Sequence, residues 1–106
     1  MHEFFRHGAY ALPVSRDTVR ADHPDFSFGV FRDPPGQVWA DFVHDTDEFV
    51  VVAEGELEIE VAGDVARCLP GDLVRIPAGA VHTLRTSHQA GSVWYYGYGH
   101  FDVASG

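Results

Sequence analysis

The sequence contains no lysine, a single cysteine and no long apolar run. Its seven basic residues are all arginine and stand against sixteen aspartates and glutamates, which gives a formal net charge of -9. Nucleic acids and anionic membranes both require clustered cations, so this balance argues against either partner. Cys68 has no second cysteine for an internal disulfide. Because no stretch approaches the ~20 apolar residues that cross a bilayer, we expect a cytoplasmic protein.

Glycine and proline recur at short intervals from residue 24 onward and leave no long window for a helix. The intervening runs, rich in β-branched and aromatic residues, predict strands over 26–31, 38–43, 49–53, 56–62, 73–76, 81–86 and 92–101. This pattern indicates an all-β protein, either a sandwich or a small barrel. The length of 106 residues suits a single domain, 1–106. Residues 1–23 lack β-periodicity, and we expect an N-terminal arm there with an edge strand near 12–14.

The clearest periodicity lies in residues 56–61, where glutamate alternates strictly with an aliphatic residue. Successive side chains of a strand point to opposite faces of its sheet. The segment therefore predicts a strand whose aliphatic face packs into the core and whose acidic face meets water, where it also discourages pairing with other sheet edges.

Three residues from separate β segments could together carry metal chemistry. His44 and Glu48 are four residues apart across a polar turn, and His82 follows much later, in a predicted strand entered through Pro77. Two imidazoles and one carboxylate form a suitable ligand set for a divalent transition metal, with positions left open for water or substrate. A histidine on a strand can equally be a hydrogen-bonded structural residue, so spacing alone leaves both interpretations open.

The surrounding residues resemble the first conserved motif of the cupin superfamily. Here Gly36 is followed by five residues and then by Phe42-Val43-His44; Glu48 follows after three more residues, and Gly55 after a further six. All of these spacings fit the motif. The match departs from the pattern at Phe42, which stands where the motif has its first histidine.

The second cupin motif is also matched. Gly71 is followed by five residues and then by Pro77-Ala78-Gly79, with His82 two residues later. Thr86 stands where the motif ends in asparagine. The resemblance, which covers residues 36–86, identifies a small single-domain cupin, cupin_2-like. It implies a double-stranded β-helix, a jelly-roll-like barrel, with a metal site inside.

For the metal, the resemblance implies His44, Glu48 and His82 as ligands of iron, manganese, nickel or zinc. Because Phe42 removes one ligand of the usual four, two outcomes stay open. Either the remaining three hold a metal in the two-histidine, one-carboxylate manner, or the site has become an apolar-lined pocket with a hydrogen-bonded histidine pair.

A substrate pocket is expected beside this site. Trp94, Tyr96 and Tyr98 share one face of the last predicted strand, and with Phe42 they are the candidates for lining a cavity that takes a small organic molecule. Trp39 could pack against the same cavity or against an interface.

Two functions from different classes are compatible with these residues. The first is metal-dependent action on a small molecule, with oxygenase, decarboxylase, isomerase and dehydratase chemistry all found among cupins. The second is a non-catalytic module that binds or senses a small molecule with a degenerate metal site. A homodimer is expected in either case, because a barrel with an arm has an edge strand to share.

Overall fold

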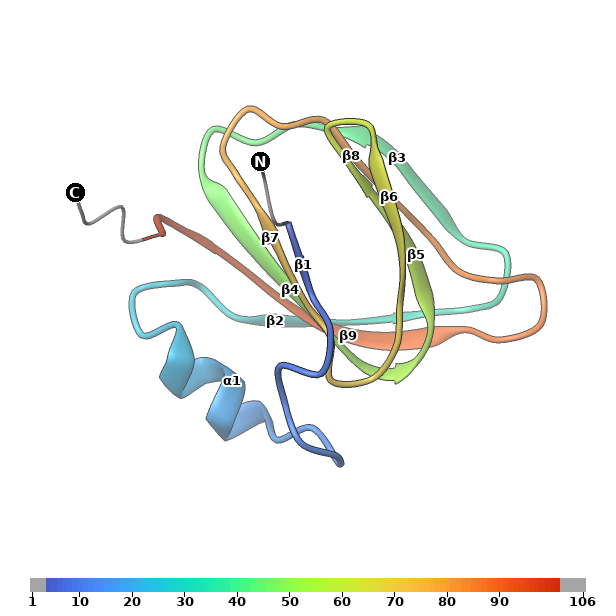
Figure 1. Cartoon of the computed structure of the whole chain (residues 1–106), viewed down its shortest axis with the longest axis horizontal. Coiled ribbons are helices and arrows are strands. Elements are labelled where there is room, and N and C mark those ends of the chain that lie inside the picture. The colour runs from blue at the N-terminus through green and yellow to red at the C-terminus, as the bar shows by residue number, and fades with distance from the viewer. Residues whose placement is uncertain (1–3, 102–106) are drawn as a thin grey trace.

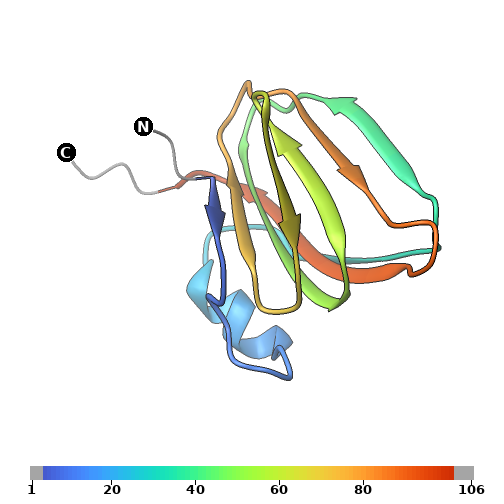
Figure 2. The same ribbon diagram turned by 45° about the vertical axis from the view of Figure 1, so that its right-hand side comes forward.

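The computed structural model describes residues 4–101, which form nine strands and one helix. In chain order the elements are β1 (Phe5–Arg6), α1 (Arg16–Asp22), β2 (Gly29–Asp33), β3 (Val38–Phe42), β4 (Asp47–Gly55), β5 (Leu57–Val61), β6 (Asp64–Cys68), β7 (Leu73–Ile76), β8 (His82–Arg85) and β9 (Ser92–Gly99). The strands make two antiparallel sheets, ordered β1-β7-β4-β9-β2 and β3-β8-β5-β6, which face each other while α1 lies outside (Figures 1 and 2). The predicted all-β class is confirmed.

The space between the sheets is filled by one apolar cluster that draws side chains from both. It includes Val50 and Val52 of β4, Ile59 of β5, Leu84 of β8 and Trp94 of β9. The alternation in residues 56–61 explains how β5 takes part, since its aliphatic residues are buried while Glu58 is exposed. The acidic outer face of β5 is therefore confirmed.

Strand β4 is buried on both faces, which explains why its sequence reads as a continuous apolar run. Val50 and Val52 point between the sheets, whereas Phe49 and Val51 belong to a second cluster on the outer face of the five-stranded sheet. Val19 of α1 covers that second cluster and is fully buried. This two-sided burial fixes the position of β4, which carries one of the candidate ligands.

The expected edge strand near residues 12–14 is wrong. Those residues form a bend, and the seven-residue helix α1 follows directly. Ser15 caps the helix by accepting a hydrogen bond from the Thr18 amide, 3.3 Å away. A helix this short is stabilised by burying Val19 rather than by its own propensity, so the sequence around it gives little sign of it.

The arm supplies an edge strand at β1 instead, which pairs with β7. Asp72, just before β7, holds the arm in place: its carboxylate accepts hydrogen bonds of 2.8 Å from the amides of Gly8 and Leu69 and lies 2.8 Å from Nδ1 of His7. Burial by itself raises the pKa of Asp72, but these hydrogen bonds outweigh it and hold the pKa below its usual value. Residues 1–3 of the predicted arm, and 102–106 of the predicted domain, lie outside the described residues.

A β-bulge in β3 matters for the site. The register of β3 against β8 shifts between Trp39 and Phe42, and Asp41 within the shift has a positive φ of 57°. Because of the shift Trp39 lies opposite Leu84 and Phe42 opposite His82, so both aromatic rings face the interior although they are three residues apart.

Within residues 4–101, no helix has the length and apolar character that a bilayer crossing requires.

Candidate metal centre

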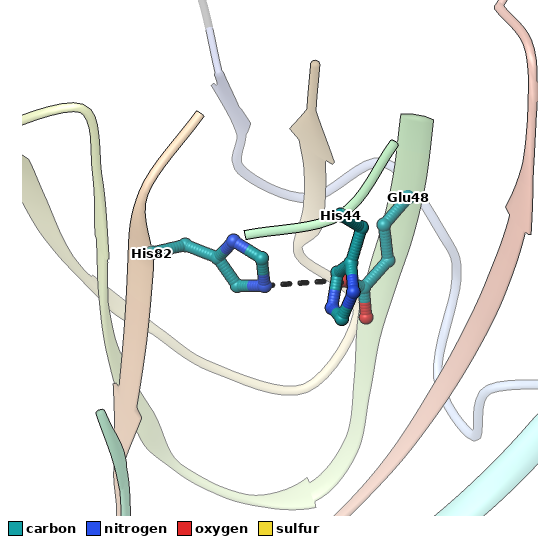
Figure 3. Close-up of side chains that lie close together, drawn as sticks. All are labelled: His44, Glu48 and His82. Atoms are coloured by element: carbon teal, nitrogen blue, oxygen red, sulfur yellow. Dashed lines mark ion pairs between the residues drawn. The ribbon is translucent and has the colours of Figure 1, made fainter. Parts of the chain in front are cut away.

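His44, Glu48 and His82 converge at one end of the space between the sheets (Figure 3). His44 lies in the loop after β3, Glu48 is the second residue of β4 and His82 is the first residue of β8. One ligand atom from each residue lies within 4.8 Å of the other two, which is close enough for all three to reach a single ion. Nε2 of His82 is 3.2 Å and Nε2 of His44 is 3.6 Å from Oε1 of Glu48.

The loop that carries His44 and the loop that precedes His82 are held together by backbone and side-chain hydrogen bonds. The amide of Gly79 donates to the carbonyl of His44 over 2.9 Å. The Asp47 carboxylate accepts from the amides of Ala78 and Phe101 at 2.8 and 2.7 Å. These contacts connect the loop after β3, the loop before β8 and the end of β9, and so fix the three candidate ligands relative to one another.

The donor chemistry of the cluster fits a cation. Nδ1 of His82 lies 3.1 Å from the carbonyl of Ala80, and a hydrogen bond to that acceptor requires the proton to be on Nδ1. In the neutral imidazole Nε2 then presents a lone pair toward Oε1 of Glu48. That oxygen is buried and has no hydrogen-bond partner, although His82 is only 3.2 Å away. Two facing lone pairs in a buried site favour a positive charge between them, which either a proton or a metal ion provides.

Burial and the neighbouring Glu48 shift the pKa values of His82 and Tyr98. Burial favours the neutral form of His82, but its contacts with Glu48 and with the Ala80 carbonyl outweigh burial and raise the pKa. Burial raises the pKa of Tyr98 to about 12, with the charge of Glu48 and then the neighbouring Tyr96 adding to it. Tyr98 pairs directly opposite Glu48 in the sheet and keeps its hydroxyl proton near neutral pH.

A cavity of about 180 Å³ adjoins the three residues. Besides His44, Glu48 and His82 it is lined by Phe31, Trp39, Phe42, Leu84, Trp94 and Tyr98. Of the predicted pocket residues, Phe42, Trp94 and Tyr98 border it, and Trp39 lines the cavity as well. Tyr96 does not border the cavity; its ring packs 5.7 Å from those of both Trp94 and Tyr98.

Sequence reasoning missed Phe31 and Leu84 of this lining, and it missed Asp33. Asp33 is buried, and Oδ2 of its carboxylate accepts hydrogen bonds from the indole nitrogens of Trp39, at 3.1 Å, and Trp94, at 2.8 Å. Two tryptophans from different sheets are thereby fixed by one oxygen. Asp33 lies beyond the end of the strand predicted over 26–31, and nothing in the sequence there indicates that it binds two tryptophans 6 and 61 residues away.

A second hollow, of about 390 Å³, lies outside the sheets beside the end of α1. Its lining combines Arg6 and Arg75 with Asp22 and Asp25, so that charges of both signs offset one another. None of the three converging residues borders it. We therefore assign the candidate site to the smaller inner cavity, which adjoins His44, Glu48 and His82.

Several solved cupin structures superpose on this chain. Among solved structures, an RmlC-like cupin from Shewanella frigidimarina superposes with a TM-score of 0.65 at 18% identity, over 70% of this chain and 65% of the other. KdgF from Halomonas sp. gives 0.64 at 24% identity, over 74% and 73%. A sugar phosphate isomerase from a cupin superfamily, SPO2919 of Silicibacter pomeroyi, gives 0.63 at 27% identity, over 70% of this chain but 50% of the isomerase. The two likenesses below 25% identity show the fold alone.

No curated protein matches the chain. The Cupin_2 family model, which describes a cupin domain, matches residues 29–96, more than half of the chain and a range that contains all three converging residues. The expected cupin architecture is thus confirmed, and the chain belongs to the Cupin_2 domain family.

Proposed function

We propose that this cupin domain holds one divalent transition metal ion through His44, Glu48 and His82 and acts on a small organic molecule in the adjoining cavity. The observation that carries the proposal is the buried Oε1 of Glu48, on which Nε2 of His82 and Nε2 of His44 converge at 3.2 and 3.6 Å. When both nitrogens present lone pairs, this buried cluster needs a positive charge between them, which a bound cation supplies.

The ligand types suit iron, manganese, nickel or zinc, since imidazole and carboxylate serve all four. Three protein ligands leave open coordination positions, which is the arrangement of catalytic rather than structural metal sites. When bound, such an ion supplies Lewis-acid polarisation of a substrate oxygen or activation of dioxygen. Phe42 stands in the place of a fourth ligand and lines the cavity beside the other three residues.

The remaining residues of the site bind the substrate and orient it. Tyr98 borders the cavity and keeps its proton, so its hydroxyl can donate a hydrogen bond to a substrate oxygen. The rings of Phe31, Trp39 and Trp94 exclude water from the wall of the cavity, which strengthens polar contacts made inside it. The Ala80 carbonyl favours the His82 tautomer with its proton on Nδ1, which leaves the lone pair of Nε2 free to bind a metal ion.

The comparisons support chemistry on small molecules without choosing a reaction. One similar structure is named as a sugar phosphate isomerase and covers 70% of this chain. Oxygenase, decarboxylase, isomerase and dehydratase activities all remain within the proposal, because the fold by itself does not decide among them.

A non-catalytic binding or sensing role is the second candidate. Phe42 favours it, because it replaces a ligand with an apolar ring that is 38% exposed beside the cavity. The two candidates differ in whether a ligand needs the ion: a sensor with a degenerate site binds its ligand equally well with and without metal.

We also propose a homodimer. The two sheets end in β1, β2, β3 and β6, and each of these edge strands offers backbone groups to a second copy. Light scattering after gel filtration measures the mass of the particle directly. A mass of one chain at micromolar concentration contradicts the dimer.

The metal site is tested by calorimetric titration of zinc into metal-free protein. We expect one zinc ion per chain in the wild type and in a control variant, His88→Ala, whose histidine is exposed and away from the site. His44→Ala and His82→Ala should lose high-affinity binding while keeping the circular dichroism of the wild type. Binding in folded His82→Ala that equals the wild type contradicts the proposal.

A further inference from the structure

Six aromatic rings form a closed collar beside the candidate metal centre. Each ring centre lies between 4.9 and 6.1 Å from the next, and the last ring returns to the first. Aromatic side chains interact directly at such distances. In order, the members of the aromatic collar are Phe31, Trp39, Phe42, His44, Tyr98 and Tyr96. They come from both sheets and from the loop after β3, so the collar depends on the whole fold.

The collar is the exposed part of the cavity wall. Five of its six members border the cavity, and Tyr96 completes the circuit behind them. Each member is partly exposed, and the exposure of Phe42 reaches 38%. The rest of the lining is exposed by 4% or less, namely Glu48, His82, Leu84 and Trp94. Contiguous exposed apolar surface around a cavity is typical of a ligand-binding groove, so the collar presents rings for a ligand to cover.

The collar offers rings rather than hydrogen-bond donors. The indole nitrogens of Trp39 and Trp94 both donate to Oδ2 of Asp33, at 3.1 and 2.8 Å, which leaves neither N–H for a ligand. The phenol of Tyr98 is the polar group of the lining besides the three candidate metal ligands. A ligand body rich in hydroxyl groups would exchange hydrogen bonds to water for contacts with rings, which is unfavourable.

The rings are held in place before any ligand arrives. Asp33 is 7% exposed and joins Trp39 of one sheet to Trp94 of the other. Phe31 stacks on both Trp94 and Tyr96, with ring centres 4.8 and 4.9 Å apart and an interplanar angle of 29° in each pair. A site whose rings are already ordered loses less conformational entropy when a ligand packs against them.

We infer that the ligand of this site has a planar aromatic ring that packs against the collar and an oxygen-bearing head that faces His44, Glu48 and His82. The position of the head rests on the proposed function. A metal ion with open positions takes a neutral or an anionic oxygen, so the charge of the head is not what the collar selects. Since the collar is partly exposed, a ligand can also continue beyond it into solvent. The ring is preferred because aromatic pairs gain free energy beyond that of the area they bury.

Three carboxylates with the same charge and head group but different bodies measure this preference. Benzoate carries a planar ring, cyclohexanecarboxylate a saturated ring of similar size, and glucuronate a sugar ring. Calorimetric titration into zinc-loaded protein should show saturable binding of benzoate that is at least about threefold tighter than that of either other carboxylate. A smaller preference over either of them, or no binding of benzoate, overturns the inference.

Phe42→Leu and Phe28→Leu are a matched pair that tests whether the collar causes the preference. Both substitutions remove the ring of a partly exposed phenylalanine and keep an apolar side chain. Phe42 belongs to the collar, whereas Phe28 packs beside Tyr95 in the cluster on the outer face of the five-stranded sheet. Phe42→Leu should lower the ratio of benzoate to cyclohexanecarboxylate affinity by about two- to tenfold, and Phe28→Leu should leave it unchanged. Equal ratios in the two variants, both folded by circular dichroism, contradict a preference made by the collar.

Neutral probes in metal-free protein separate the collar from the proposed metal site. Phenol and cyclohexanol carry no charge for Glu48 to repel, and neither requires an ion. Protein that takes up no zinc but binds phenol at least about threefold more tightly than cyclohexanol contradicts the proposed function and supports the role of the collar. Protein that holds one zinc per chain and shows no preference for benzoate contradicts the role of the collar and leaves the metal site intact.

Discussion

Replacing Glu48 with glutamine should make the metal-free protein more stable and the metal site weaker. Glu48 is 3% exposed, and its Oε1 lies 3.2 Å from Nε2 of His82 without a hydrogen bond. Glutamine keeps the shape of the side chain but removes the charge and adds two N–H donors. Placed at the position of Oε1, its amide nitrogen can donate to the free lone pair of His82, so an unsatisfied contact becomes a hydrogen bond.

The magnitude follows from the buried oxygen. Leaving a buried polar group unsatisfied costs about 1–3 kcal/mol, so Glu48→Gln should raise the free energy of unfolding of the metal-free protein by about that amount. A gain of 1 kcal/mol corresponds to a rise of about 4–8 °C in Tm for a domain of this size. The site meanwhile loses its one anionic ligand. Zinc affinity should fall by at least about a hundredfold, the upper end of what loss of a supporting contact to a metal ligand costs.

Urea unfolding in the presence of a chelator measures the first effect, and competition with a zinc indicator measures the second. The unfolding is carried out well above the pKa of His82, because a protonated imidazole compensates Glu48 and hides the gain. Glu58→Gln is the control: Glu58 is exposed on the outer face of β5 and pairs with Arg85, so its loss should change the free energy of unfolding by less than about 1 kcal/mol and leave zinc binding alone. If Glu48→Gln destabilises the metal-free protein and binds zinc as the wild type does, Glu48 is a structural residue and the reasoning is refuted.

Three further outcomes are expected. Phe42→His places an imidazole beside both histidine ligands, whose ring centres lie 6.1 and 6.2 Å from that of Phe42. The substitution should raise zinc affinity by about tenfold or more, whereas Phe42→Leu should not. A zinc affinity of Phe42→His that equals the wild type in a chelator competition contradicts a site that lacks one ligand. Asp33→Ala leaves two indole N–H groups without their acceptor and should lower the free energy of unfolding by about 1–3 kcal/mol for each N–H that stays buried. If the variant unfolds in urea as the wild type does, the two hydrogen bonds of Asp33 do not stabilise the fold. Asp72 has a lower pKa folded than unfolded, so the stability it contributes is present above the unfolded pKa and is lost as pH falls through the folded pKa. Asp72→Asn should lower the free energy of unfolding by about 1.5–3 kcal/mol at neutral pH and remove that part of its dependence on acid pH. Wild-type and variant curves of unfolding midpoint against pH that run parallel contradict this role of Asp72.

Much of the fold is predictable from the sequence because its strands carry their own signals. Strand β7 was predicted with the bounds it has, and β5 within one residue at each end, since both alternate or run apolar between turn residues. Strand β6 was missed, because its exposed Val65 and Arg67 break the usual pattern of a half-buried strand. Helix α1 was missed for a different reason: its stability depends on burying Val19 against the outer face of the sheet, a tertiary contact.

The candidate site was also predictable only in part. His44, Glu48 and His82 could be proposed from spacing together with the family resemblance, and the structure brings them together. Part of their surroundings could be predicted as well, since Phe42, Trp94 and Tyr98 border the cavity, but the contacts that place these rings could not. Phe42 faces the interior because of a bulge in β3, and Asp33 reaches two tryptophans across the fold; both depend on pairing between distant segments.

Elemental analysis of the protein purified without chelators tests the central claim most directly. We predict about one equivalent of a divalent transition metal per chain in the wild type, and background levels in His44→Ala and His82→Ala prepared in the same way. A wild-type protein that contains no metal above background, even after incubation with iron, manganese, nickel or zinc salts and removal of the excess, contradicts the metal centre and leaves an apolar binding cavity beside a histidine pair.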